Sequence, residues 1–153
     1  MGSSSGGSAF GKTQDKWAEF PPVARNSTKT MQINLGYRCN QSCSHCHVDA
    51  GPNRTEEMQS ETIDLVFEYI DQWGIRTLDL TGGAPELHPL FKQTVRRARQ
   101  RDLHIIDRCN LTVLLEEGQE ASANFLAKNE VHIIASLPCY SPENVDTQRG
   151  KGV

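Results

Sequence analysis

The chain has 153 residues, of which 37% are apolar, enough for one domain with its own hydrophobic core. Its 16 basic and 19 acidic residues leave a net charge of −3, so charge gives no reason to expect nucleic acid or an anionic membrane surface as a partner. No apolar run is long enough to cross a membrane and the first residues lack the apolar core of a secretory signal, so we expect a cytoplasmic protein.

Residues 1–25 are rich in Ser, Gly and Pro, which is typical of a disordered arm or a cloning remnant, and we assign them no function. The folded part is expected to span residues 26–153. Its first strand is predicted at residues 31–35, where apolar and polar residues alternate ahead of Gly36.

Three cysteines follow this strand on one short loop. Cys39, Cys43 and Cys46 are spaced C-x₃-C-x₂-C. Three thiolates on one loop can hold three irons of a cubane 4Fe-4S cluster, and the fourth iron is then free to bind and activate a second molecule. The plainer alternative is a structural zinc site in which His45 or His47 completes a tetrahedral set of three Cys and one His, and the spacing alone leaves both open. The chain's five cysteines, an odd number, fit a reducing compartment and a metal site better than disulfides.

Helices and strands are expected to alternate beyond the cysteine loop. A helix should begin at Ser60 and end at Gly74, with apolar side chains at helical spacing facing the core. These core-facing side chains are Ile63, Val66, Phe67, Ile70 and Trp73. The elements predicted next are a strand at 76–80, a helix at about 89–101, a strand at 103–107, a helix at 120–128 and a strand at 131–136. Such alternation indicates an α/β fold with a parallel sheet.

Paired glycines mark the end of the second predicted strand. Gly82 and Gly83 lack side chains, so the backbone there can approach a ligand closely. Because the carboxyl ends of parallel strands meet at one edge, this glycine motif and the cysteine loop should lie side by side. Glycines after a strand also occur in simple turns, so a purely structural role for this motif stays open.

Together these motifs resemble the radical S-adenosylmethionine (SAM) enzymes, in which a C-x₃-C-x-φ-C loop binds a 4Fe-4S cluster and a glycine motif after the second strand contacts the SAM amino group. Four segments are similar, more closely, to the radical SAM enzymes of arsenosugar biosynthesis: CNQSCSHCHVDAGP, LTGGAPELHP, DRCNLTVLLEEGQE and ASLPCYSPENVDTQRGKGV. The resemblance covers about residues 31–153. It implies a partial (β/α) barrel truncated after about four β/α units, so that residues 26–153 are the N-terminal part of a radical SAM core without the remaining barrel and C-terminal domain.

The resemblance also implies the ligands of both cofactors. Cys39, Cys43 and Cys46 would bind the cluster. The residues that would contact SAM are His45, Gly82, Gly83, Glu86, Asn110 and Ser136. Four of these assignments have plainer alternatives: His45 as a surface residue, Glu86 as a helix-start acid, Asn110 as a turn cap and Ser136 as a small core residue.

Cys109 and Cys139 follow the third and fourth predicted strands and are the predicted catalytic thiols. Trivalent arsenic is soft and thiophilic, so two thiols at the catalytic edge would suit an arsenical substrate, although free cysteines are often inert and buried. The implied reaction is adenosylation of a dimethylated trivalent arsenical by a 5′-deoxyadenosyl radical, with a flavodoxin or ferredoxin as electron donor and neither nucleic acid nor membrane as partner. The alternatives are a radical SAM enzyme acting on a peptide or cofactor precursor, and a zinc-stabilised binding module.

Overall fold

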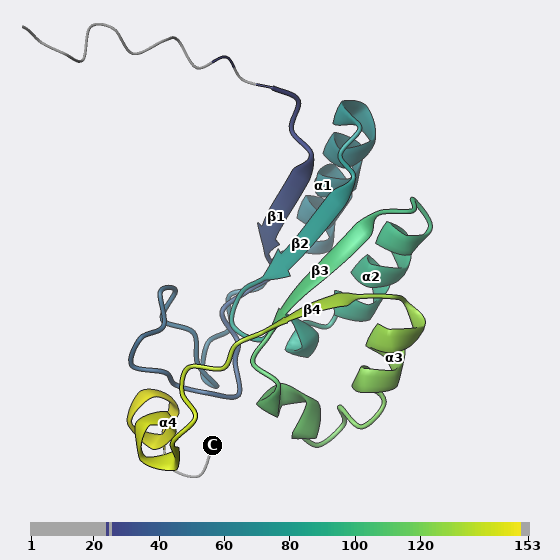
Figure 1. Cartoon of the computed structure of the whole chain (residues 1–153). Helices are drawn as coiled ribbons and strands as arrows, with labels where there is room; N and C mark the ends of the chain where they lie inside the picture. The colour runs from purple at the N-terminus through teal and green to yellow at the C-terminus, as the bar shows by residue number, and fades with distance from the viewer. Residues whose placement is uncertain (1–23, 25, 151–153) are drawn as a thin grey trace, which may run out of the picture.

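The computed structural model describes residues 24 and 26–150, so the arm predicted at residues 1–25 lies outside the described residues except for Ala24. Four strands form one parallel sheet in the order β1-β2-β3-β4 (Figure 1). Their bounds are β1 Thr30–Asn34, β2 Thr77–Thr81, β3 His104–Cys109 and β4 His132–Ala135. The helices between them are α1 Ser60–Trp73, α2 Phe91–Arg99 and α3 Ser122–Lys128, and they cover one face of the sheet. The predicted α/β fold with parallel strands is confirmed.

The hydrophobic core fills the space between the sheet and α1 and α2. The strands contribute Ile33, Leu78, Leu80 and Ile105, and the helices contribute Ile63, Phe67, Ile70, Phe91, Val95 and Ala98, all of them buried. Trp73 was expected in this core but is 59% exposed. As the tenth residue after Ile63 it has turned about 80° away from the core-facing side of the helix, and it stacks on Tyr69 instead.

Helix α1 ends where the sequence predicts but begins without the predicted cap. Gly74 ends α1 in the left-handed conformation, with φ +63°, as predicted. The residue before the helix is Gln59 and not Ser60, and no side chain caps this end. Two short 3₁₀ helices, η2 Pro85–Leu87 and η3 Thr112–Leu115, follow β2 and β3 and were not predicted. None of the helices in the described part of the chain is long and apolar enough to cross a membrane.

The second face of the sheet is polar. Gln32 of β1 donates a hydrogen bond of 2.8 Å to Asp79 of β2, and Arg108 of β3 forms an ion pair of 2.8 Å with the same carboxylate.

A further helix, α4 Pro142–Arg149, lies beyond the carboxyl ends of the strands, beside the cysteine loop (Figure 1). The backbone N–H of Ser44 donates to the carbonyl oxygen of Gln148 at 3.0 Å. The C-terminal helix thus fixes the loop that carries the three thiols.

Candidate functional site

A cavity of about 460 Å³ opens at the carboxyl ends of the four strands. It brings together eight of the predicted site residues: Cys39, Cys43, His45, Cys46, Gly82, Gly83, Asn110 and Ser136. They come from the cysteine loop after β1 and from the segments that follow β2, β3 and β4. The expectation that loops at successive strand ends share one edge therefore holds for these residues.

The cysteine loop owes its shape to backbone pairing within the loop. The N–H of Cys39 donates to the carbonyl of Gly51 at 3.1 Å, and that of Tyr37 donates to the carbonyl of Glu56 at 3.0 Å. Isolated bridges pair Gly36 with Glu57 and Arg38 with Gly51. The loop is therefore closed on itself at its base, and the thiols lie on the part that faces the cavity.

Two of the three cysteine sulfurs accept a hydrogen bond. The Asn110 side-chain N–H lies 3.5 Å from Cys39 Sγ, and the Ala50 backbone N–H lies 3.2 Å from Cys46 Sγ. Such donors stabilise a thiolate and tune the potential of a cluster bound to it. Burial raises the pKa of the Cys39 thiol, and burial followed by the charge of Cys39 raises that of Cys43. Without a bound cation these two groups are therefore neutral thiols, and a metal centre is what would hold them deprotonated.

A cluster and a zinc ion place different demands on the spacing of the thiols. A tetrahedral zinc ion about 2.3 Å from each sulfur holds its ligand atoms about 3.8 Å apart. Within the described residues, three such ligand atoms come within 4.8 Å of one another at Glu86, Asp107 and Cys109, and not at the cysteine loop. A cubane does not need its ligands around one point, because each thiolate binds a different iron. Three thiols on one loop therefore fit a cluster.

Gly82 and Gly83 bring the segment after β2 against the cysteine loop. The N–H of Gly83 donates to the carbonyl of Gly36, and the N–H of Ala84 donates to the carbonyl of Arg38, both at 2.9 Å. Gly82 has φ +146°, and a Cβ there would lie 2.5 Å from the carbonyl oxygen of Gly36. A Cβ on Gly83 would collide with the carbonyl oxygen of Arg38. Only glycine fits at both positions.

Asn110 joins the end of β3 to the cysteine loop. Its side-chain N–H donates to Asn40 Oδ1 at 2.8 Å as well as to Cys39 Sγ. Its Oδ1 accepts a hydrogen bond of 3.0 Å from the N–H of Val113 and so caps η3. Asn110 therefore both holds the turn after β3 and lines the cavity.

Two arginines at the cavity were absent from the predicted site. Arg149 of α4 is buried and donates to the backbone carbonyls of Asn110, at 3.2 Å, and Ser136, and its charge opposes the rise in the pKa of Cys43. Arg108 lines the cavity from β3. The run Ser141-Pro142-Glu143 is a helix-start signal that would have predicted α4, but its docking on the cysteine loop depends on tertiary contacts.

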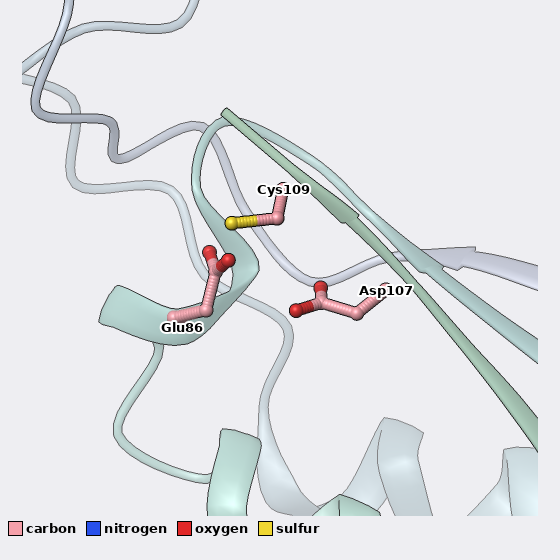
Figure 2. Close-up of side chains that lie close together, drawn as sticks. All are labelled: Glu86, Asp107 and Cys109. Atoms are coloured by element: carbon pink, nitrogen blue, oxygen red, sulfur yellow. The ribbon is translucent and has the colours of Figure 1, made fainter. Parts of the chain in front are cut away.

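The structure places Glu86, Cys109 and Cys139 away from this cavity. Side chains alternate between faces along a strand, so Arg108 points to the cavity while Asp107 and Cys109 point to the helix-covered face. Glu86 lies in η2, buried beside them (Figure 2). Cys139 lies in the segment between β4 and α4, where a hydrogen bond from the backbone of Ser141 lowers the pKa of its thiol.

Known proteins share this fold and parts of this sequence. A solved structure, SuiB from Streptococcus suis bound to S-adenosylmethionine, matches 82% of this chain and 29% of its own with a TM-score of 0.66 at 13% identity, a likeness of fold. The chain is 30% identical over 89 residues to a probable GTP 3′,8-cyclase from Sulfurisphaera tokodaii, covering 58% of this chain and 28% of that protein. It is 43% identical over 56 residues to the putative peptide biosynthesis protein YydG from Bacillus subtilis, covering 36% of this chain and 18% of that protein.

The chain spans less than a third of the length of each of these proteins. A family model described as the radical SAM superfamily matches residues 33–149, from β1 to the end of α4. That match covers more than half of the chain and includes every thiol and glycine at the cavity, so this protein belongs to the radical SAM superfamily, whose enzymes use a 4Fe-4S cluster together with SAM.

Proposed function

We propose that Cys39, Cys43 and Cys46 bind a 4Fe-4S cluster, that SAM binds beside it in the same cavity, and that SAM is cleaved there reductively. The observation that carries this proposal is that the three thiols and the Gly82-Gly83 segment line one cavity at the ends of four parallel strands. When bound and reduced, the cluster supplies the electron that splits the sulfur–C5′ bond of SAM into methionine and a 5′-deoxyadenosyl radical.

The chain's own residues have distinct tasks in this proposal. The N–H groups of Asn110 and Ala50 donate to two of the sulfurs and so lower their basicity. The absence of side chains at Gly82 and Gly83 leaves their backbone open to the SAM amino group. Arg108 and Arg149 offer positive charge to a carboxylate in the cavity. Apolar side chains on the cavity wall, Val48, Ala50, Ile134 and Ala135, exclude water from a reactive radical.

The direct test is replacement of one cluster ligand. In the Cys43→Ala protein, reconstituted with iron and sulfide without oxygen, we expect loss of the broad visible absorption of the cluster and loss of 5′-deoxyadenosine formation, because two thiolates cannot hold the cubane in place. Cys139→Ser removes a thiol outside the cavity and serves as the matched control, which should retain both signals. Undiminished 5′-deoxyadenosine from Cys43→Ala would overturn the proposal.

The more specific proposal is that the radical adenosylates a dimethylated trivalent arsenical. Its support is the likeness of four segments to the radical SAM enzymes of arsenosugar biosynthesis, and the Cys139 thiol, whose lowered pKa favours the thiolate that binds soft arsenic. Cys109 was expected to share this task, but its thiol is fully buried on the helix-facing side of β3, where a substrate in the cavity does not reach it. We therefore keep the substrate role for Cys139 alone, because its thiol is partly exposed and follows Ser136, which lines the cavity, by three residues, although Cys139 itself does not line the cavity.

A peptide is the second candidate substrate. It is favoured by the likeness to a putative peptide biosynthesis protein and by the fold shared with SuiB, which was also solved with the precursor peptide SuiA. A paired assay of 5′-deoxyadenosine and arsenic–carbon product by mass spectrometry separates the two. The arsenical proposal predicts both products from the parent protein, and unchanged SAM cleavage with less arsenical product from Cys139→Ser. Cleavage of SAM by the parent without any arsenical product would favour the peptide.

A further inference from the structure

Glu86, Asp107 and Cys109 form a buried group on the helix-facing side of β3, behind the cavity (Figure 2). Glu86 comes from η2, and the other two are two residues apart on one strand, so that their side chains share a face. One ligand atom from each residue lies within 4.8 Å of the other two. Glu86 is 4% exposed, and Asp107 and Cys109 are 0% exposed.

No N–H or hydroxyl group among the described residues donates to either carboxylate. All four of their oxygens, Glu86 Oε1 and Oε2 and Asp107 Oδ1 and Oδ2, are buried, and their polar neighbours are each other and the Cys109 thiol. Buried carboxylates are ordinarily paired with a cation or with several N–H groups, because an unpaired charge in the interior costs several kcal/mol. Burial and then the neighbouring Glu86 raise the pKa of Asp107 to about 8. The Asp107 carboxyl therefore stays protonated at neutral pH unless a positive charge is bound beside it.

No arginine or lysine of β3 supplies that charge. Arg108, the basic residue of this strand, lies between Asp107 and Cys109 in sequence but points to the opposite face, where it pairs with Asp79. Burial and then Glu86 also raise the pKa of the Cys109 thiol, and its Sγ accepts one hydrogen bond, of 3.2 Å, from the N–H of Leu111. Three acidic groups thus converge on one point, with a single backbone donor between them.

We propose that Glu86, Asp107 and Cys109 bind a divalent transition-metal ion of the Zn²⁺ type, at a site distinct from the 4Fe-4S cluster. One sulfur and up to four carboxylate oxygens can complete a shell of four or five ligands without water, which suits complete burial. The thiol excludes Mg²⁺ and Ca²⁺, which take oxygen ligands. One thiol is too few for an iron–sulfur cluster.

Such an ion would join two segments that form the cavity. Glu86 follows the Gly82-Gly83 motif by three residues, and Cys109 directly precedes Asn110, which contacts Cys39. A metal bound to both would fix η2 against the end of β3 from behind. Its role would be structural, and it does not depend on the SAM chemistry proposed above.

Cobalt(II) is the probe for this site, because thiolate ligation to Co²⁺ gives a charge-transfer band in the near ultraviolet. The titration uses the chain with Cys39→Ser, Cys43→Ser and Cys46→Ser, so that the cluster thiols contribute nothing. We expect one equivalent of Co²⁺ to produce the band and Zn²⁺ to abolish it by displacement. Cys109→Ser in this background should lose the band, and the matched control Cys139→Ser should keep it.

Two near-isosteric variants guard against misfolding of Cys109→Ser. Glu86→Gln and Asp107→Asn keep the shape of the site, and each should weaken Co²⁺ binding at least tenfold with an unchanged circular dichroism spectrum. Zn²⁺ should raise the Tm of the triple-Ser background by about 5 °C or more. It should not change the Tm of the same background carrying Asp107→Asn. Absence of the band, a band lost with Cys139→Ser, or equal Tm with and without Zn²⁺ in the triple-Ser background would overturn the proposal and leave a shared proton between the two carboxyl groups.

Discussion

Arg108 and Cys109 are neighbours in sequence, yet their side chains lie on opposite faces of the sheet. The strand predicted from sequence ends at residue 107, which leaves both residues outside it. In the structure β3 continues to Cys109, because Arg108 pairs with Ile134 and Cys109 pairs with Ala135 of β4. That pairing is a tertiary contact with no local signal. Side chains alternate between the two faces along a strand. Once β3 includes residues 108 and 109, Arg108 therefore faces the cavity and Cys109 faces the core.

The ion pair of Arg108 with Asp79 predicts a pH-dependent contribution to stability. Burial raises the pKa of Asp79, but the hydrogen bonds from Arg108 and Gln32 outweigh it and hold this pKa below its ordinary value. A depressed carboxyl pKa adds stability above the unfolded pKa of about 3.9 and loses it as the pH falls through the folded value.

Asp79→Asn should therefore lower the free energy of unfolding by about 1–2 kcal/mol at pH 7, a modest loss since the Arg108 side chain is partly solvated. Urea unfolding from pH 7 to pH 3 measures it. The difference between parent and variant should narrow below about pH 4. A difference that stays constant over this range would show that the charge of Asp79 contributes nothing.

The glycine motif and the cysteine loop behave as one element held together by backbone contacts. Their juxtaposition was predicted from strand order, but the means of contact was not. From sequence the glycines were expected either to let the backbone approach SAM or to form a simple turn. In the structure they admit the carbonyls of Gly36 and Arg38. This contact depends on the folded path of both loops, which periodicity does not describe.

Gly83→Ala should therefore separate these loops. The added Cβ meets backbone, which cannot rotate away, so we expect a loss of about 1–3 kcal/mol in stability and weaker SAM binding by the reconstituted protein. Gly51→Ala is the matched control in the same region, because the nearest atom to its new Cβ is Ser42 Oγ at 3.5 Å. Chemical denaturation and equilibrium SAM binding give the two readouts. Equal behaviour of both variants would refute the steric argument.

The strand order of the whole sheet was predictable because one rule governs it. Alternating strands and helices in a short chain favour parallel neighbours in sequence order, and the observed order β1-β2-β3-β4 follows. Because parallel strands end at the same edge of the sheet, eight of the predicted site residues line one cavity. This rule does not indicate which residues of a strand end face that cavity, and α4 lies outside the repeating pattern altogether.

The outer edge of the sheet predicts self-association. Over the described residues β4 pairs with β3 alone, and the segment just beyond it exposes Leu137 by 75%. An unpaired edge with apolar side chains is prone to pair with another chain. Leu137→Lys should shift sedimentation at high protein concentration toward the monomer. Leu115→Lys, at a leucine of η3 that is 88% exposed, should not. An identical shift for both would point to general surface charge instead of the edge.

The hydrogen bond from Ser44 to Gln148 also fixes an order of events during synthesis. Its two residues are 104 positions apart, so a ribosome needs roughly 5–20 s after Ser44 to reach the helix that immobilises the cysteine loop. Through that interval the three thiols are already made and their loop is not yet closed. For the cluster proposed above, assembly on these thiols would then follow translation of α4.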